Sequence, residues 1–194
     1  MKLLLLTLCI LSTLSCSSRK KITAKTAVST AIVKLRSPMG GHGTGFYISP
    51  TEIVSAKHVC TIPWVTPSDF SKVEEIIIDD YSDLCYIRVS GGNPHSFFYL
   101  SYEELAIGDQ TCNAGYGSFG YVYNCGKIFG MLRFYELGML NWLYFSEQFA
   151  IPGMSGGPVF YKGKVVGVTV INYHAKLGFV SNQQVKRFLN KVRK

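Results

Sequence analysis

Short runs of apolar and β-branched residues alternate with glycine- and proline-containing turns along most of the chain. From residue 26 onward each run has about four to ten residues, a length that favours strands over helices. The runs predict strands over 27–36, 45–49, 52–55, 73–78, 84–89, 110–114, 121–129, 142–145, 158–161 and 164–171. Short strands at such regular spacing are typical of barrels and sandwiches, so the pattern predicts an all-β domain of two packed β-barrels.

The last part of the sequence has helical periodicity instead. Asn182 can cap a helix over 183–194. Four apolar residues then recur at a spacing that places them on one helix face: Val185, Phe188, Leu189 and Val192. The strongest turn cluster is Gly91-Gly92-Asn93-Pro94, so we expect a first barrel over 26–92, a second over 93–181 and the helix over 182–194.

The first sixteen residues have the layout of an export signal. Lys2 supplies a positive end, residues 3–14 are apolar or small, and small residues follow where cleavage would occur. The run is too short to span a bilayer comfortably. Cys16 resembles the lipid-modified cysteine of bacterial lipoproteins, although Thr13 stands where leucine is usual. Ordinary cleavage with an incidental Cys16 is the alternative, and in both cases a polar linker over 17–25 would follow.

Composition and net charge limit the classes of molecule that the protein is expected to bind. Hydrophobic residues make up 47% of the 194 and charged residues 16%, which excludes general disorder. The net charge is +8, but the basic residues are scattered and no aromatic–basic motif is present, so we expect no nucleic acid. Basic residues of the linker and of the helix could hold the domain to an anionic membrane, with about 1 kcal/mol from each. The alternative is that they only make these segments soluble.

Four cysteines follow the export signal: Cys60, Cys85, Cys112 and Cys125. In an oxidising compartment they allow three pairings. Cys112 and Cys125 flank a stretch that is typical of a hairpin, so we expect them to pair. Cys60 and Cys85 either pair or remain buried thiols. The sequence has no Cys-x-x-Cys motif and no Cys/His cluster, so we expect no metal site and no cofactor.

Glycines surround a serine in Pro152-Gly153-Met154-Ser155-Gly156-Gly157-Pro158. They permit a tight, exposed turn that bulky residues could not enter. Such a turn can aim the N–H groups of Gly153 and Ser155 at one point, as an acyl-transfer enzyme needs in order to hold an oxyanion. Alone, the stretch is equally consistent with a simple glycine-rich turn.

Two further segments supply what a serine nucleophile requires. His58 follows an apolar strand, and a histidine titrates in the right range to act as the base of a serine. Asp83 enters another apolar strand, where a carboxylate can orient an imidazole. Each residue alone has an ordinary explanation, a surface histidine in the first case and a turn aspartate in the second.

In the order His, Asp, Ser, these segments match the trypsin/chymotrypsin-like serine proteases. They most resemble the bacterial HtrA/Deg type and the glutamyl-endopeptidase-like enzymes. Residues 43–49 resemble the early Gly-Ser-Gly-Phe hairpin of that group, 164–168 the strand after the serine, and 177–180 the final strand. The resemblance spans about 27–192. It implies two six-stranded Greek-key barrels with a C-terminal helix, and an exported serine endopeptidase that acts through an acyl-enzyme on protein or peptide substrates.

The resemblance also assigns roles. It makes His58 the general base, Asp83 its orienting partner and Ser155 the nucleophile, with Gly153 and Ser155 forming the oxyanion hole. Asp79 and Asp80 are rival acids, but no apolar strand follows either of them directly. Met154 stands where digestive proteases carry the aspartate that receives a new N-terminus, so we expect no activation of that kind. No PDZ-like extension follows in this sequence, so peptide sensing by such a domain is not expected.

The expected substrate pocket is lined by six residues: Phe149, Ala150, Thr169, Val170, Ile171 and Asn172. Phe149 stands where trypsin-like enzymes carry a pocket-floor aspartate, and Thr169 where glutamate-specific relatives carry a histidine. We therefore expect cleavage after a small or medium apolar residue. In the alternative interpretation Phe149 packs inside the second barrel. The alternative function is a catalytically silent, protease-like binding module of the cell envelope.

Overall fold

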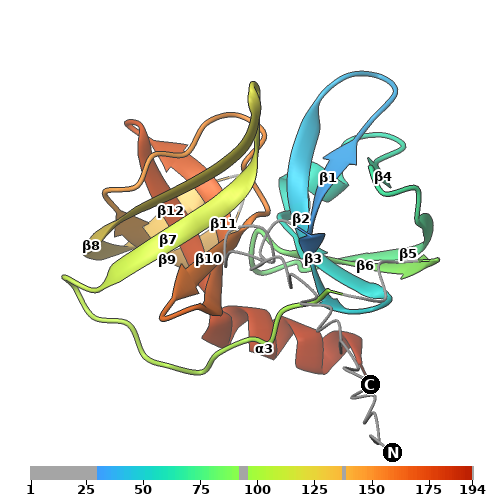
Figure 1. Ribbon diagram of the computed structural model, residues 1–194. Coiled ribbons are helices and arrows are strands. Elements are labelled where there is room, and N and C mark those ends of the chain that lie inside the picture. Colours follow the sequence, from blue (N-terminus) through green and yellow to red (C-terminus); the bar gives the residue numbers. More distant parts are fainter. Residues whose placement is uncertain (1–29, 92–95, 137–138, 194) are drawn as a thin grey trace, which may run out of the picture.

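A computed structural model describes residues 30–91, 96–136 and 139–193 (Figure 1). The expected export signal, Cys16, the linker over 17–25 and the start of the expected strand 27–36 lie outside the described residues. Two β units stand side by side, and one helix, α3 (Asn182–Val192), runs beneath both (Figure 1). Within the described residues, no helix is long and apolar enough to cross a membrane.

The first unit is a six-stranded antiparallel sheet in the order β4-β1-β2-β3-β6-β5. Its strands are β1 (Ile32–Arg36), β2 (His42–Ser49), β3 (Glu52–Ser55), β4 (Thr66–Pro67), β5 (Lys72–Ile78) and β6 (Cys85–Ser90). A short helix, α2 (Lys57–Cys60), follows β3. The sequence pattern did not predict α2 or β4, because elements of four and two residues are too short to show a periodicity.

The second unit is a closed barrel in the order β10-β11-β12-β9-β8-β7. Its strands are β7 (Gln110–Gly117), β8 (Gly120–Glu136), β9 (Met139–Ser146), β10 (Pro158–Tyr161), β11 (Lys164–Tyr173) and β12 (Lys176–Ser181). The expected strand over 121–129 is only part of β8. Beyond it β8 and β9 continue as a paired hairpin whose apolar residues, such as Leu132, are exposed, so period-two alternation does not mark its extent.

The two units have the same cyclic strand order. If β4 paired with β5, the first sheet would close in the same sequence of neighbours as the second barrel. The first sheet lacks this ladder between β4 and β5. β4 has only two residues, and one of them, Pro67, has no N–H to donate, which explains why the first sheet remains open at this edge.

One apolar cluster runs through both units and joins them. Phe46 of β2 packs edge-on against Phe98 in the connecting segment, with ring centroids 6.2 Å apart. Phe98 packs in the same way, at 5.2 Å, against Phe160 of β10. Burial of a large apolar side chain contributes about 1.5–3 kcal/mol, so this aromatic chain is a substantial part of what fixes the two units against each other.

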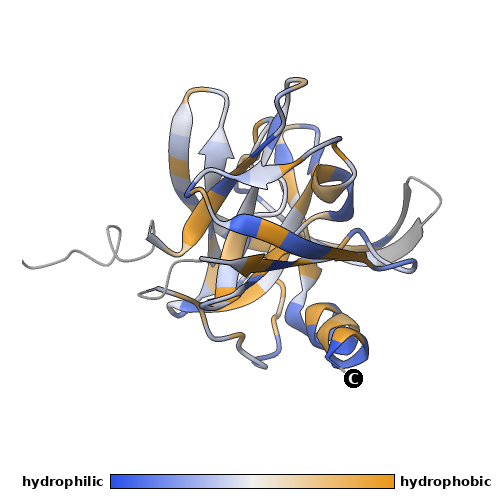
Figure 2. Ribbon diagram, turned by 90° about the vertical axis from the view of Figure 1, so that its right-hand side faces the viewer, coloured by the Kyte–Doolittle hydropathy of each residue, from blue (hydrophilic) through white to orange (hydrophobic). Residues whose placement is uncertain are grey.

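The C-terminal helix is amphipathic, as predicted. Val185, Phe188 and Leu189 are buried and the opposite face is polar (Figure 2). The predicted cap was wrong, because Ser181 is the N-cap and Asn182 is the first helical residue. The side-chain amide of Asn182 instead donates to the carbonyls of Ser101 and Val165, which a capping side chain could not reach. Two ion pairs then join the helix to the first sheet, Lys191 with Asp79 and Arg193 with Glu52.

Candidate active site

His58 lies in α2, directly after β3, and its imidazole is held by one carboxylate. Its Nδ1 lies 2.6 Å from Asp83 Oδ2, and its backbone N–H donates to Asp83 Oδ1 over 3.0 Å. The carboxylate is an acceptor, so Nδ1 carries the proton in this hydrogen bond and Nε2 of the neutral ring is left as the basic atom. Because both oxygens bind the same residue, Asp83 fixes the position of the helix as well as the orientation of the ring.

The rival acids have other surroundings. Asp79 accepts a hydrogen bond from the Ser82 hydroxyl and lies 3.8 Å from Lys191 Nζ. Asp80 is exposed. Within the described residues, Asp83 is the carboxylate that the structure brings to His58.

A disulfide reinforces the contact between His58 and Asp83. Cys60, two residues after His58, is bonded to Cys85, two residues after Asp83. The bond therefore ties α2 to the start of β6, beside the hydrogen bonds described above. The second disulfide joins Cys112 and Cys125, which face each other directly in the β7–β8 ladder.

Ser155 lies in the connection between β9 and β10, and glycines shape the turn there. Residues 151–154 form a β-turn closed by the Met154 N–H and the Ile151 carbonyl at 3.0 Å, with Gly153 at φ +96°. Pro152 and Gly153 are the residues that a type II turn favours at its two central positions. At Gly156, φ is +85°, and a Cβ would lie 2.1 Å from Ser55 Oγ. Only glycine fits so close to the first sheet.

The serine turn therefore reaches the strand that leads to His58. The Ser155 carbonyl accepts the N–H of Thr44 in β2 over 2.8 Å. A Cβ on Gly156 would also lie 2.9 Å from the backbone nitrogen of Ala56, the residue that precedes α2. The structure thus brings the Ser155 turn of the second unit against the part of the first unit that carries His58.

Two residues that sequence reasoning did not single out support this turn. The buried Thr44 hydroxyl donates to the Gly153 carbonyl over 2.7 Å and accepts the Tyr116 N–H over 2.8 Å. The ring of His42 fills the space where a side chain on Gly153 would be, with Nε2 3.1 Å from the Tyr116 carbonyl. Neither residue had a signal in the sequence for this role, because both act on backbone groups of segments far away in the chain.

The atoms expected to do chemistry have no partners within the described residues. Neither the N–H of Gly153 nor that of Ser155 donates to a described acceptor. Ser155 Oγ and His58 Nε2 are not joined by a hydrogen bond either, as is common for such pairs before a substrate tightens them. Two donors, a hydroxyl and a basic nitrogen are therefore available to a ligand.

The two segments of the expected substrate pocket lie together. The Asn172 side chain donates to the Ala150 carbonyl over 2.6 Å, and Thr169 exchanges backbone hydrogen bonds with Gly156 and Gly157. Ala150, Thr169 and Val170 are buried, Ile171 is partly buried and Asn172 is exposed. The Phe149 side chain is 46% exposed, so it does not pack inside the second barrel.

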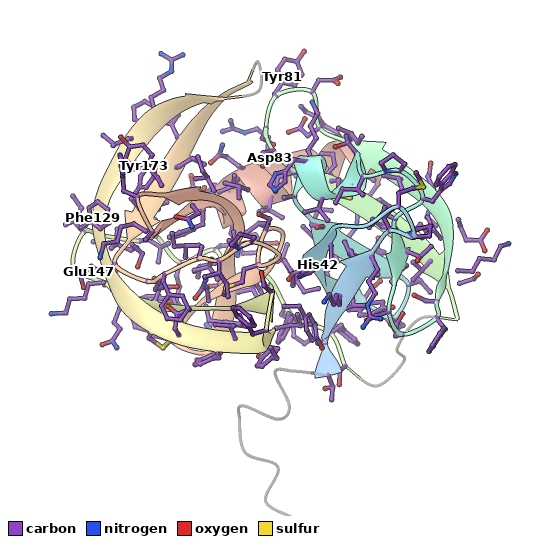
Figure 3. All side chains as sticks on the ribbon, turned by 90° about the horizontal axis from the view of Figure 1, so that it is seen from above. His42, Tyr81, Asp83, Phe129, Glu147 and Tyr173 are labelled. Carbon is purple, nitrogen blue, oxygen red and sulfur yellow. A yellow bond between two sulfur atoms is a disulfide. The ribbon has the colours of Figure 1, made fainter. Side chains whose placement is uncertain are left out.

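The segment just before the expected pocket residues is farther from the site. Glu147, two residues before Phe149, lies on the outer side of the second barrel, away from His42 and Asp83 (Figure 3). Among the described residues, no group of three or more His, Cys, Asp or Glu side chains could hold a metal ion.

Comparison with known proteins identifies solved structures with a similar fold. No protein-family model and no curated protein matches the chain. Three crystal structures of Rv3671c, a protease from M. tuberculosis, are similar to it: an inactive serine-to-alanine variant, a second inactive form and an active form. Their identities to this chain are 21%, 22% and 23%, with TM-scores of 0.74, 0.73 and 0.75. The matches cover 88%, 87% and 87% of this chain and 90%, 92% and 83% of those chains. This likeness confirms the predicted fold class, that of the chymotrypsin-like proteases. Of the two expected six-stranded barrels, the second is closed and the first is an open sheet.

Proposed function

We propose that this protein is a serine endopeptidase that cleaves peptide bonds through an acyl-enzyme, with His58, Asp83 and Ser155 as its triad. The observation that carries the proposal is the Asp83-held imidazole of His58, in the part of the first unit against which the glycine-shaped Ser155 turn packs. The fold it shares with the protease Rv3671c supports the same class of reaction. The specific likeness to HtrA/Deg enzymes rests on the sequence motifs alone.

The chemistry follows from the free atoms. Ser155 Oγ attacks the substrate carbonyl while His58 Nε2 takes its proton, and Asp83 stabilises the imidazolium that forms. The N–H groups of Gly153 and Ser155 receive the oxyanion. His58 then gives the proton to the leaving amine, and a water molecule hydrolyses the acyl-enzyme by the same steps in reverse order.

The pocket residues and the N-terminal segment extend the proposal. A pocket between Ala150 and Val170 suits a small or medium apolar side chain, because both residues are apolar and buried. The signal-like residues 1–16 support export to the cell envelope or beyond, with Cys16 as the proposed lipid attachment site. Cell fractionation of wild type and Cys16→Ala tests the anchor: a lipid-anchored wild type stays with membranes at high salt, and the variant does not.

A fluorophosphonate probe tests the nucleophile directly. We expect the mature domain to be labelled and the Ser155→Ala variant to remain unlabelled, because only an activated serine reacts at a useful rate. A well-folded wild type that takes up no label would contradict the proposal and favour the silent binding module.

The role of Asp83 can be tested separately. Asp83→Asn removes the acceptor that holds His58 Nδ1–H, so turnover of a peptide substrate should fall by about 10⁴-fold while the circular dichroism spectrum is retained. Asp80→Asn, at an exposed neighbour, is the matched control and should retain full turnover. Equal losses in both variants would show that the loop, and not this carboxylate, matters.

A further inference from the structure

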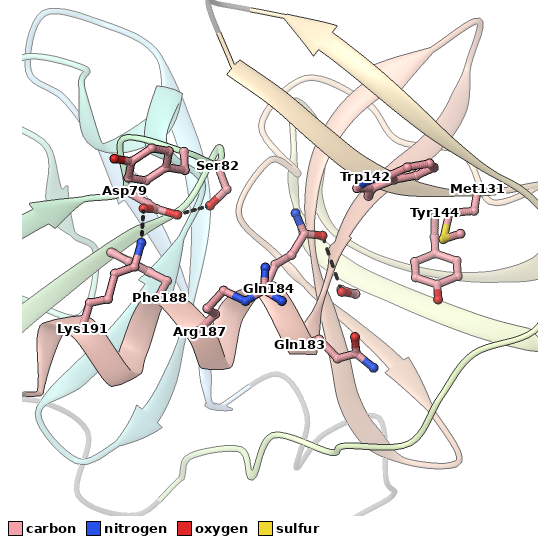
Figure 4. A pocket seen from close by; sticks show the side chains of 12 residues that line it. Asp79, Ser82, Met131, Trp142, Tyr144, Gln183, Gln184, Arg187, Phe188 and Lys191 are labelled. Carbon is pink, nitrogen blue, oxygen red and sulfur yellow. Dashed lines mark hydrogen bonds and ion pairs between the residues drawn. The ribbon is translucent and has the colours of Figure 1, made fainter.

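A cavity of about 490 Å³ opens between the two units, above α3 and behind the loop that carries Asp83 (Figure 4). Asp79, Tyr81 and Ser82 of the first unit form one wall, the β8–β9 hairpin forms the opposite wall, and α3 forms the floor. The size is in the range of pockets that bind small molecules and short peptide segments. None of the proposed catalytic residues lines it.

The two walls present exposed aromatic rings to the cavity. Tyr81 is 74% exposed and Trp142 is 53% exposed, and Met131 and Tyr144 lie beside Trp142. Aromatic and methionine side chains that stay in water at the walls of a cavity are the usual anchors of a bound apolar side chain. Between them, the Gln183 and Gln184 amides offer donors and acceptors of the kind that pair with a peptide backbone.

The unpaired cationic side chains at and beside the cavity indicate which charged groups the ligand should have. Arg187 lines the floor and has no ion-pair partner among the described residues. Arg133 faces Trp142 directly in the β8–β9 ladder, so the two side chains leave the hairpin on the same side, and Arg133 is likewise unpaired within the described part of the chain. Arg187 lines the cavity and Arg133 does not, but Arg133 lies next to Trp142 of the cavity wall. One unpaired guanidinium group in the cavity and a second beside it complement carboxylates. By contrast, Lys191 is already engaged with Asp79 and with the ring of Tyr81.

We propose that this cavity binds a polypeptide segment in which acidic residues flank an aromatic side chain. A long polyanion fits less well, because the unpaired cationic groups are few and the aromatic walls offer such a ligand no partner. A membrane surface fits less well because the site is concave. That the segment belongs to a substrate, captured outside the catalytic cleft, rests on the proposed peptidase function.

The site is also placed to influence the catalytic loop. Residues 79–82 lead directly into Asp83, and the loop is held by the Asp79 N–H on the Leu84 carbonyl, 3.0 Å, and by the Ser82–Asp79 hydrogen bond. A ligand that packs on Tyr81 contacts this loop two residues before Asp83. Substrates that carry the acidic–aromatic segment should therefore show a lower KM than the same substrates without it.

Binding can be measured without catalysis. The Ser155→Ala protein is titrated into fluorescein-labelled Gly-Ser-Glu-Phe-Asp-Glu-Ser-Gly, and fluorescence anisotropy gives Kd. We expect binding to weaken about tenfold or more in Trp142→Ala and in Arg187→Glu, as for anchor residues of an interface. Trp64→Ala removes another exposed tryptophan, and Lys72→Glu makes the same charge change on β5, so both serve as matched controls with unchanged Kd.

Three results would overturn the proposal. The first is no binding of the peptide at concentrations up to about 1 mM, the weak end of specific recognition. The second is equal affinity in all four variants. The third is equal binding of a peptide with serine in place of phenylalanine together with displacement by dextran sulfate, which would identify a site for polyanions. Because the Ser155→Ala protein is used throughout, a failure of the fluorophosphonate test would leave these results interpretable.

Discussion

Thr44 holds the serine turn to the first sheet through both its backbone and its side chain. Its N–H binds the Ser155 carbonyl, and its hydroxyl binds both the Gly153 carbonyl and the Tyr116 N–H. Two of these bonds hold the turn, through the carbonyls of the Gly153–Met154 and Ser155–Gly156 peptides, and the third ties Thr44 to β7. The orientation of the candidate oxyanion donors therefore depends on a residue that makes no contact with the reacting atoms.

Thr44→Val tests this dependence, because valine keeps the shape and removes the hydroxyl. Two buried polar groups lose their partner, so we expect the free energy of unfolding to fall by about 2 kcal/mol. We also expect the rate of fluorophosphonate labelling to fall, because the Gly153 peptide is no longer held. Thr44→Ser retains the hydroxyl and should restore the labelling rate. A Thr44→Val protein that is destabilised but labels at the wild-type rate would show that the role is structural only.

The contrast with His58, Asp83 and Ser155 explains what a sequence can reveal at this scale. Those three lie in segments whose residue types and order together indicate a mechanism. Thr44 and His42 act through hydrogen bonds to backbone groups of residues about seventy or more positions away. Contacts to a backbone leave no trace in residue types, so no pattern along the chain could have assigned these roles.

At the scale of elements, the Cys60–Cys85 disulfide joins α2 to β6 beside the candidate base and its acid. α2 has only four residues and no side-chain cap, so it is too short to be stable as an isolated helix. Its position is set by what it is attached to. The hydrogen bonds to Asp83 and the disulfide are the two attachments on the side of β6.

Replacing both Cys60 and Cys85 with serine should affect activity as well as stability. A loop of this size contributes about 2–4 kcal/mol to the free energy of unfolding when it is closed by a disulfide. In addition, kcat should fall at temperatures where the variant is still folded, because α2 is less firmly held against Asp83. Cys112→Ser with Cys125→Ser is the matched control, since that pair lies in the β7–β8 ladder, and it should lower the melting temperature with little change in kcat. Similar kcat in both double variants would count against the role of the first disulfide.

The strands themselves were largely predictable, because alternation and turn residues mark both faces and ends of a half-buried strand. The exceptions have physical reasons. β4 is held by two residues of pairing with β1, and the outer part of β8 is held by its ladder with β9. Both segments are strands because they pair with a neighbouring strand, and not because their own residues alternate. The hydropathy pattern of the sequence therefore did not mark them as strands.

At the scale of the molecule, α3 follows the second barrel and is fastened to the first sheet. Arg193 donates to both carboxylate oxygens of Glu52, over 3.1 and 2.6 Å. Burial of Glu52 opposes its ionisation, but the hydrogen bonds and charge of Arg193, with hydrogen bonds from Ser49 and Tyr86, outweigh it and lower the pKa of Glu52 below its ordinary value. The helix thus bridges the two units through an ion pair that depends on pH.

The sign of this dependence is fixed by the lowered pKa. The stabilisation is fully present above the ordinary glutamate value of 4.5 and is lost as the pH falls through the lower value in the folded protein. In Arg193→Gln we expect a loss of about 0.5–1 kcal/mol at pH 7, since the pair is partly exposed. For a chain of this size, each kcal/mol of lost stability lowers the melting temperature by about 2–4 °C. The difference between variant and wild type should shrink at pH 3, and an equal difference at both pH values would exclude this origin.

Each of the two disulfides of the described residues joins cysteines of the same unit. Cys60–Cys85 lies in the first unit, and Cys112–Cys125 lies in the second barrel. A chain that emerges amino end first, from a ribosome or through a membrane channel, can therefore oxidise and lock the half with His58 and Asp83 before Ser155 has appeared. Maturation would then follow the order of the chain, in which the candidate base and its acid are fastened first and the candidate nucleophile is added last. In the proposed peptidase, the growing chain would hold a base without its serine during that interval and could not cut itself or its neighbours.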